Sequence, residues 1–192
     1  MNTRFRLGIS TFALCVAGAF AAPAQGAVTV IGGGLARACY EAVEYTKVSG
    51  EKAIDICDMA LEQESLTKRN RAATLTNRGI LFMRLGQHQR ALVDYNRSIR
   101  LMPELLESKV NQGAALYGLG RYEEAMTALN AGIYTDSVDA RAVGFYNRAL
   151  CYEKLGDLQS AYEDFRKALE TQPAFKQAAD QMARFTVVEA PG

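Results

Sequence analysis

The sequence of 192 residues has no tryptophan, one histidine, four cysteines and four prolines. A single histidine, His88, leaves little material for a histidine-based metal cluster or a histidine-dependent catalytic triad. The charges nearly cancel, with 22 basic against 21 acidic residues, so the net charge of +1 implies no strong field for nucleic acid or anionic lipid. We therefore expect no metal, no cofactor, no nucleic-acid partner and no enzymatic activity. What remains is 49% hydrophobic, a composition typical of a globular chain.

The first 24 residues have the order of a secretory signal peptide. Arg4 and Arg6 precede an apolar run from about Leu7 to Phe20, and small residues follow up to Ala24. The run is about 14 residues long, whereas roughly 20 are needed to span a bilayer, which argues against a membrane anchor. We expect cleavage after Ala24, and hence a mature chain with no membrane span that is periplasmic or secreted.

Export shifts the expectation for the cysteines towards a disulfide. Lipid modification of Cys15 is an alternative fate for the first of them, but Leu14 is a poor fit to the small residue that lipoprotein processing needs. Cys39 and Cys57 are 18 residues apart on two neighbouring predicted helices, and Cys151 lies far along the chain. Cys39 with Cys57 is the natural pair, and two buried thiols in a helix hairpin are the alternative.

The body of the chain repeats with a period of 34 to 36 residues. Gly79 recurs as Gly113 and then as Ala149. Further positions recur in the same register: Gly86, Gly120 and Gly156; Ala91, Ala125 and Ala161; Tyr95, Leu129 and Phe165; Ser98, Gly132 and Ala168; and Pro103, Ser137 and Pro173. So many matches in one register exceed what chance produces.

Each unit has the pattern of two antiparallel helices. Apolar and small residues spaced by three and four predict a first helix, which ends at Gly86 in the first unit. A second apolar stripe begins at Ala91 and ends before Pro103, because proline cannot continue a helix. Gly79 and Ala91 have a packing reason, since two helices come close only where a side chain is absent or tiny. A large side chain at either position is expected to force the pair apart.

Units of this period, with this order of glycine, aromatic, alanine and proline, resemble tetratricopeptide repeats. The resemblance covers about residues 71–173 and implies an all-α fold, a right-handed superhelical solenoid of antiparallel helix pairs. It places the three repeats at about 72–105, 106–139 and 142–175. The two extra residues between the second and third units predict either a longer turn or a lengthened helix.

The flanks of the array have less regular patterns. Residues 35–66 resemble a degenerate helix hairpin acting as a cap, with Glu41 where the first helix should carry a small packing residue. The glycine-rich stretch within 25–34 does not continue into a dinucleotide-binding pattern, because Arg37 stands where a third small residue is needed. We expect it to be a flexible lead-in. Residues 174–186 predict a capping helix, followed by a loose tail.

The family resemblance places the first helix of each unit on the concave side of the superhelix, where peptides or helices of partner proteins dock. Asn77, Asn111 and Asn147 occupy the same site in the three units. An amide has a donor and an acceptor, so such a ladder can hold the backbone of an extended peptide, although its recurrence also fits hydrogen bonds between repeats. The other residues expected to line the groove are Thr76, Ile80, Met83, Val110, Ala114, Tyr117, Tyr146, Leu150 and Glu153.

Charge is sparse among these positions. The chaperone-binding members of the family use a lysine-rich clamp for a carboxylate, and here Thr76, Val110 and Tyr146 stand at the corresponding places, which disfavours such a clamp. Arg78 and Arg148 flank two of the asparagines. They are candidates for contacts with an acidic segment, or for salt bridges that are solvated or join repeats.

Together these patterns predict a non-enzymatic adaptor that binds a peptide or helix of a partner protein in its concave groove, with Tyr117 and Tyr146 as apolar anchors. The short signal with its A-x-A ending is of bacterial style, so the cell envelope is the expected location. The alternative is a structural, self-associating component of an envelope complex, a homo-oligomer that acts through its outer surface.

Overall fold

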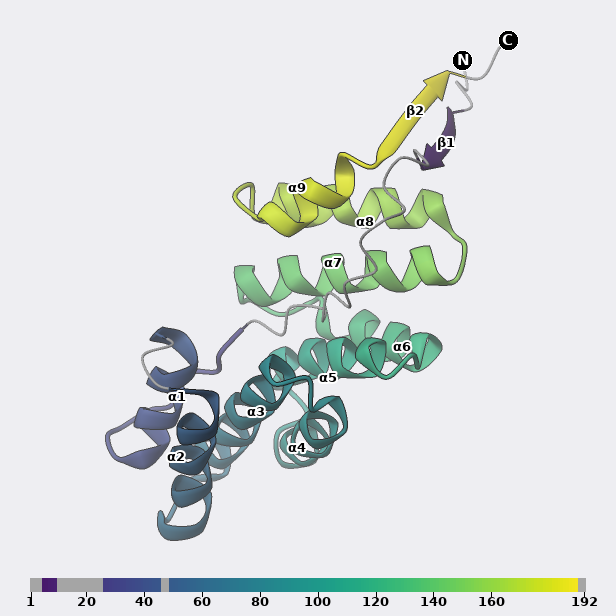
Figure 1. Ribbon diagram of the computed structural model, residues 1–192. Helices are drawn as coiled ribbons and strands as arrows, with labels where there is room; N and C mark the ends of the chain where they lie inside the picture. The colour runs from purple at the N-terminus through teal and green to yellow at the C-terminus, as the bar shows by residue number, and fades with distance from the viewer. Residues whose placement is uncertain (1–4, 10–25, 46–48, 190–192) are drawn as a thin grey trace.

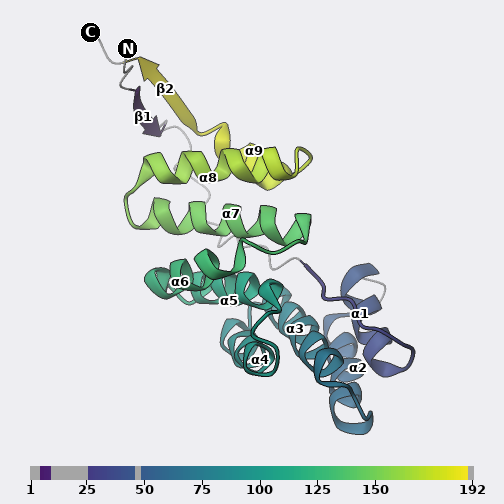
Figure 2. The same cartoon turned by 180° about the vertical axis from the view of Figure 1, so that it is seen from behind.

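The structure is a computed structural model that describes residues 5–9, 26–45 and 49–189. The described ranges contain nine helices stacked as successive antiparallel pairs (Figures 1 and 2). The helices are α1 (Leu35–Tyr45), α2 (Gly50–Gln63), α3 (Lys68–Arg84), α4 (His88–Leu101), α5 (Leu106–Gly118), α6 (Tyr122–Gly132), α7 (Val138–Lys154), α8 (Leu158–Thr171) and α9 (Lys176–Met182). This arrangement confirms the all-α superhelical solenoid. None of the described helices combines the length and hydropathy needed to span a bilayer.

The turn inside each predicted unit ends its first helix in the same way. Gly86, Gly120 and Gly156 all have positive φ angles, of 70°, 74° and 86°. In the first unit the Gly86 N–H donates to the carbonyl of Met83 at 3.0 Å, and the next N–H donates to Phe82 at 2.8 Å. This pair of bonds satisfies carbonyls left over at the helix end, and glycine reaches the left-handed conformation at least steric cost.

Within each pair the helices approach closely at the small residue of the first helix. A Cβ atom added at Gly79 would overlap the ring of Tyr95, and one added at Gly113 would overlap the side chain of Leu129. Both bulky residues, and Phe165 in the third unit, are fully buried. The missing side chain of one helix is therefore the space that the bulky residue of the other fills.

The first and second units meet at a buried cluster of hydroxyl groups. Thr76 on α3 contacts the hydroxyl of Ser98 on α4 at 2.9 Å and that of Ser108 on α5 at 2.7 Å. Ser98 also donates to the carbonyl of Ala72 at 2.9 Å. Thr76, expected to face the groove, instead joins two repeats, because its side chain has hydroxyl partners on both neighbouring helices.

The next two junctions use the same positions without hydroxyl groups. A Cβ atom added at Gly132 would lie 2.8 Å from Val110, and one added at Gly144 would lie 3.4 Å from it. The absence of a side chain at Gly132 makes room for the valine, and the absence at Gly144 makes room for Ile133, which a Cβ atom there would approach to 2.9 Å. At the last junction the corresponding positions hold Tyr146, Ala168 and Ala178, all of them buried. Val110 and Tyr146 therefore belong to the contacts between units, as Thr76 does.

The two extra residues before the third unit are divided between a turn and a helix. Helix α6 has 11 residues, against 14 in α4 and in α8, so the chain leaves it early and passes through residues 133–137. Helix α7 then has 17 residues against 13 in α5. Its first turn is capped by Ser137, whose hydroxyl accepts from the Ala140 N–H at 3.3 Å.

The cap hairpin of α1 and α2 contains the disulfide between Cys39 and Cys57, whose Cα atoms are 4.9 Å apart. A second link comes from Glu64, which follows α2. Its carboxylate accepts from the backbone N–H groups of Leu35 and Ala36 at 2.5 and 3.0 Å, at the N-terminus of α1. A negative charge at this end of a helix satisfies free donors and interacts favourably with the helix dipole.

The C-terminal flank differs from the expectation. The helix predicted over 174–186 is confined to α9, which ends at Met182, and the chain continues as strand β2 (Phe185–Glu189). This strand includes part of the tail expected to be loose, and it pairs antiparallel with β1 (Phe5–Ile9). Apart from β1, the predicted signal segment 1–24, with Cys15 and the cleavage site after Ala24, lies outside the described residues. Cleavage there would remove β1 and leave β2 without this partner.

The close approach within helix pairs predicts the effect of Gly113→Val. The valine side chain would overlap Leu129 and come within 3.2 Å of the Ala125 carbonyl, so we expect a loss of roughly 1–3 kcal/mol in the free energy of unfolding, the range typical of overpacked cores. Urea denaturation followed by circular dichroism measures it. Gly33→Ala is the control, because a Cβ atom there meets nothing within 4 Å. Equal stability of the two variants would contradict the packing argument.

The cysteines predict a definite thiol count. In a chain beginning at Gln25, denatured without reductant, we expect one reactive thiol, that of Cys151, because Cys39 and Cys57 are bonded to each other. Burial raises the pKa of the Cys151 thiol to about 12, so the folded protein should react slowly with iodoacetamide at pH 8. Three reactive thiols in the denatured, unreduced protein would disprove the disulfide.

Candidate peptide-binding groove

Residues of α1, α3, α7 and α9 border a hollow of about 710 Å³. We use the name concave groove for this hollow together with the adjoining face of α3 that carries Asn70 and Asn77. Its lining comes from α1, α3, α7, α9, the turn after α8 and the segment before α1. The lining residues are Gly26, Ala27, Tyr40, Val43, Glu44, Ile80, Arg84, Ser137, Asp139, Val143, Gln172, Ala174, Phe175 and Gln177. Of the three first helices that the resemblance places on the inner side, α3 and α7 contribute described residues to this lining.

An extended stretch of the chain, residues 26–31, lies along the α3 face of this groove, and we call it the groove segment. Its first two residues, Gly26 and Ala27, border the hollow, and Val28 to Ile31 lie against α3. Figure 1 shows it in purple, leading away from α1 towards α7. Val28 and Val30 are buried, whereas Thr29 and Ile31 are exposed, which is the alternation of a strand that covers a surface with one face. The buried valines belong to a cluster that also contains Ala36, Ala60, Ala72, Ala73 and Leu105.

The groove segment corrects the expectation of a flexible lead-in at 25–34, of which residue 25 is not described. Full burial of a valine side chain is worth about 1.5–3 kcal/mol, an upper value because unfolded chains already bury some surface. Two buried valines therefore hold residues 28 and 30 in place. The neighbouring glycines, which prompted the expectation, begin only after Ile31.

Asn77 holds the backbone of the groove segment on both sides of one residue. The N–H of Val28 donates to the Asn77 side-chain oxygen at 2.8 Å, and the Asn77 amide nitrogen donates to the Val28 carbonyl at 2.9 Å. Asn77 is fully buried. Both hydrogen bonds involve only the backbone of Val28 and are independent of its side chain. They are the kind of contact that the asparagine ladder was expected to make with an extended peptide.

Asn70 makes a second contact of the same kind, which the sequence reasoning missed. The Ile31 N–H donates to its side-chain oxygen at 3.2 Å, and its amide nitrogen donates to the Ile31 carbonyl at 2.7 Å. Seven helical residues separate the asparagines by about 10 Å, and three extended residues cover about the same length. The spacing of Asn70 and Asn77 on one face of α3 is the signal that could have revealed the pair.

The other two asparagines of the ladder are also fully buried. Within the described residues, neither the oxygen nor the nitrogen of the Asn111 amide has a hydrogen-bond partner. A buried polar group without a partner costs about 1–3 kcal/mol, so folding gains nothing from the Asn111 amide in this state. Asn147 occupies the equivalent position on α7.

The apolar residues expected to line the groove are divided between groove and core. Ile80 lines the hollow, and Tyr117 is half-buried with its ring 5.5 Å from that of Tyr122. Tyr146 is 3% exposed because its ring packs between Phe165 and Phe175, so it is part of the core and not an open anchor. The remaining expected residues are buried or half-buried: Met83, Ala114, Leu150 and Glu153.

Arg78 and Arg148 form ion pairs between helices. Arg78 binds both oxygens of Asp94 on α4 at 2.7 Å and contacts Asp58 on α2 at 2.6 Å. Burial by itself would lower the pKa of the Arg78 guanidinium, but the bonds and charges of these two carboxylates outweigh it and raise the pKa. Arg148 binds Asp164 and Asn130 in the same manner. The pair of Arg78 with Asp58 joins the first unit to the cap, as the salt-bridge alternative expects. The pair of Arg148 with Asp164 lies within the third unit and is largely buried, so it is neither solvated nor between repeats.

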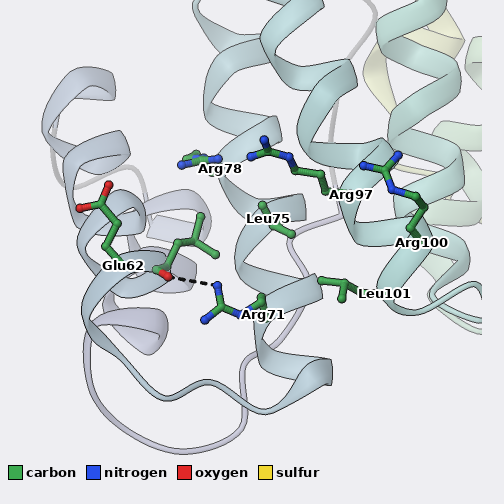
Figure 3. A pocket seen from close by; sticks show the side chains of 8 residues that line it. Glu62, Arg71, Leu75, Arg78, Arg97, Arg100 and Leu101 are labelled. Carbon is green, nitrogen blue, oxygen red and sulfur yellow. Dashed lines mark hydrogen bonds between the residues drawn. The ribbon is translucent and has the colours of Figure 1, made fainter.

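Arg78 also lies away from the groove segment. It lines a separate hollow of about 480 Å³ between α2, α3 and α4, together with Arg71, Arg97 and Arg100 (Figure 3). Figure 3 shows Glu62 across this hollow from the arginines. A contact between Arg78 and a peptide in the concave groove is therefore not supported by its position.

The concave groove itself carries little charge. Among the described residues, its lining has one arginine, Arg84, two acids, Glu44 and Asp139, and no lysine. Arg84 donates to the Val43 carbonyl at 2.8 Å, and burial lowers its pKa. Uncharged polar side chains, among them Ser137, Gln172 and Gln177, make up much of the rest of the lining, and they can hydrogen-bond the backbone of an uncharged extended segment.

The tetratricopeptide repeat family matches this chain at residues 106–139 and 142–175, the second and third units. The Hsp70-Hsp90 organizing protein of Triticum aestivum is 30% identical over 120 residues, which cover 62% of this chain and 19% of that protein. The DnaJ homolog subfamily C member 7 of Mus musculus is 26% identical over 142 residues, covering 72% of this chain and 26% of that protein. The chain thus spans about a fifth of the first relative and about a quarter of the second.

Solved structures share the fold. MamA from Desulfovibrio magneticus RS-1 superposes with a TM-score of 0.60 at 22% identity, covering 78% of this chain and 82% of that one. The second domain of human RPAP3, in complex with an HSP70 peptide, gives 0.54 at 26% identity, covering 61% and 96%. YrrB, described as having an unusual peptide-binding site, gives 0.60 at 24% identity, covering 77% and 74%.

Asn77 and Asn111 occupy equivalent positions, but we expect their substitution by alanine to change the free energy of unfolding differently. Asn77→Ala should lower the free energy of unfolding by about 1–3 kcal/mol, because it leaves the buried backbone groups of Val28 without partners. Asn111→Ala should be neutral or stabilising, because that amide has no partner among the described residues. Urea denaturation of the two variants measures the difference. A loss at Asn111 equal to that at Asn77 would contradict this distinction.

Proposed function

The chain belongs to the tetratricopeptide-repeat family, and on this premise we propose that it is a non-enzymatic adaptor whose concave groove binds an extended segment of a partner protein. The family relationship supports a role in protein interaction. The finer statement, that the groove is the binding site, rests on the contacts within the groove.

The observation that carries the proposal is the two-way bond between Asn77 and the backbone of Val28. It supports the proposal, because here an extended stretch of backbone has its N–H and carbonyl groups paired with a side chain of α3. The buried Asn111 amide adds to this support, since a polar side chain without a described partner is what a further residue of bound backbone would satisfy. Backbone pairing of this kind gives affinity, while side-chain pockets give specificity.

The partner proposed here differs from the peptides that some relatives bind. A domain of human RPAP3 is in complex with an HSP70 peptide. The described lining of this chain's groove has two acids, one arginine and no lysine, so a carboxylate-rich peptide would meet net negative charge. We therefore infer a partner segment that is uncharged where it enters the groove.

We place this activity in the bacterial cell envelope, periplasmic or secreted. The order of charge, apolar run and small residues over 1–24 supports export, and so does the disulfide between Cys39 and Cys57, because such bonds persist mainly in oxidising compartments.

Site-specific photocrosslinking in the native host tests the groove against the outer surface. A photoreactive amino acid replaces Glu44, an exposed residue of the groove lining, or Val93, an exposed residue of α4. We expect a crosslinked partner protein from position 44 and none from position 93, because both side chains are accessible but only one lies at the groove. The exposed positions leave the helices intact, which circular dichroism verifies.

The reverse pattern would overturn the proposal. Crosslinks from position 93 alone would favour the structural alternative, in which the outer surface makes the contacts. Crosslinks of the chain to a second copy of itself from position 93 would identify that alternative as self-association.

A further inference from the structure

We propose that the groove segment is a built-in ligand of the concave groove, and that the partner is an extended segment of the same chemistry, which must displace it. This chemistry is a pair of β-branched apolar residues at alternate positions, as in Val28-Thr29-Val30, preceded by small residues. The inference deepens the proposed function and rests on it, because it names what the groove selects and how access is controlled.

The segment is bound as a separate peptide would be. Its backbone is paired at Val28 and at Ile31 by side chains of α3, and not by strands of a sheet. Its two buried side chains point to the same face, and the residue between them is exposed. Each of these contacts is available to any chain of the same pattern.

The position before the valines adds selectivity. Gly26 has a φ angle of 124°, and a Cβ atom added to it would lie 3.2 Å from the Cβ of Ala140 on α7. The groove therefore has little room for a side chain at this point. A competing segment needs glycine two residues before its first buried apolar residue.

The connection to α1 allows release without unfolding the cap. Three glycines, residues 32–34, follow the segment, and two of them have positive φ angles, of 106° and 90°. Helix α1 is held independently, by the Glu64 carboxylate at its N-terminus and by the disulfide to α2. The segment can thus leave the groove by rotation about the glycines, while α1 stays in place.

When the groove segment of the chain itself occupies the groove, the apparent affinity of every competing segment falls by the same factor. If the groove segment fills the groove for about nine-tenths of the time, the apparent Kd of a competitor rises about tenfold, since only the empty fraction binds. Release of the groove segment should restore the intrinsic affinity.

The test uses two variants of the whole chain and one synthetic peptide. In Val28→Asp/Val30→Asp, charges at the buried positions expel the groove segment. In the control, Thr29→Asp/Ile31→Asp, the same charges lie at exposed positions of the same segment. The probe is the blocked peptide GAVTVIG, identical to residues 26–32, with a dye at its C-terminus, and fluorescence anisotropy measures its binding.

We expect the peptide to bind Val28→Asp/Val30→Asp at least tenfold more tightly than it binds the wild type or the control. A peptide with aspartate in place of both valines should not bind, and Asn77→Ala in the expelled background should abolish binding. Equal affinity of the peptide for all three proteins, or no binding to any, would overturn the inference.

A second measurement covers the case in which the double aspartate variant does not fold. In the wild type, hydrogen exchange at the Val28 amide should be slow, and a large excess of unlabelled peptide should displace the segment and speed the exchange. Exchange that is fast without peptide, or unchanged at saturating peptide, would contradict the built-in ligand. Failure here, with crosslinks still formed at position 44, would leave the proposed function standing, whereas peptide binding without those crosslinks would overturn the proposed function instead.

Discussion

The close approach of two antiparallel helices is the constraint on which this structure depends. Gly79 and Gly113 offer no side chain where Tyr95 and Leu129 press against the first helix, and Ala149 offers a methyl group. This complementarity sets how closely the two helices of a pair approach each other. Successive first helices contact one another, and α1, α3 and α7 contribute residues to the concave groove. The groove thus depends on contacts between the helix pairs as well as on the packing within them.

Much of the fold can be predicted from the sequence because the same pattern of small, apolar and turn residues occurs in three successive units. Local features, such as the glycines that end first helices, recur in one register and predict the pairs. Contacts between units are harder to infer, since they depend on residues that are neighbours only after folding. Thr76 was assigned to the groove from its place on the helix, yet Ser98 and Ser108 hold it between units. Periodicity identifies a helix face but not the partner that covers it.

The sequence predicted that an asparagine side chain would pair with an extended backbone, but it did not predict that this backbone would be residues 26–31 of the same chain. The amide of Asn77 pairs with an extended backbone, as its donor and acceptor suggested. Asn70 was missed because it does not recur in the other units, and Glu64 because its partner helix lies earlier in the chain. The groove segment was missed because two valines beside three glycines are too short a strand pattern to distinguish from a linker. The two valines can be recognised as a bound strand only when the surface that buries them is known.

The three junctions between units have a consequence for how such an array can change. Hydroxyl groups fill the first junction, a valine seated over two glycines fills the second, and a tyrosine with two alanines fills the third. Placing the third unit directly after the first would set Gly144 where Ser108 stands, so Thr76 and Ser98 would each lose one hydroxyl partner. The order of the units is therefore encoded in their contacts. An array can be lengthened by duplicating one repeat only if the contacts between all neighbouring repeats are the same. In this chain the contacts differ from one junction to the next, so duplication of a repeat would create a mismatched junction.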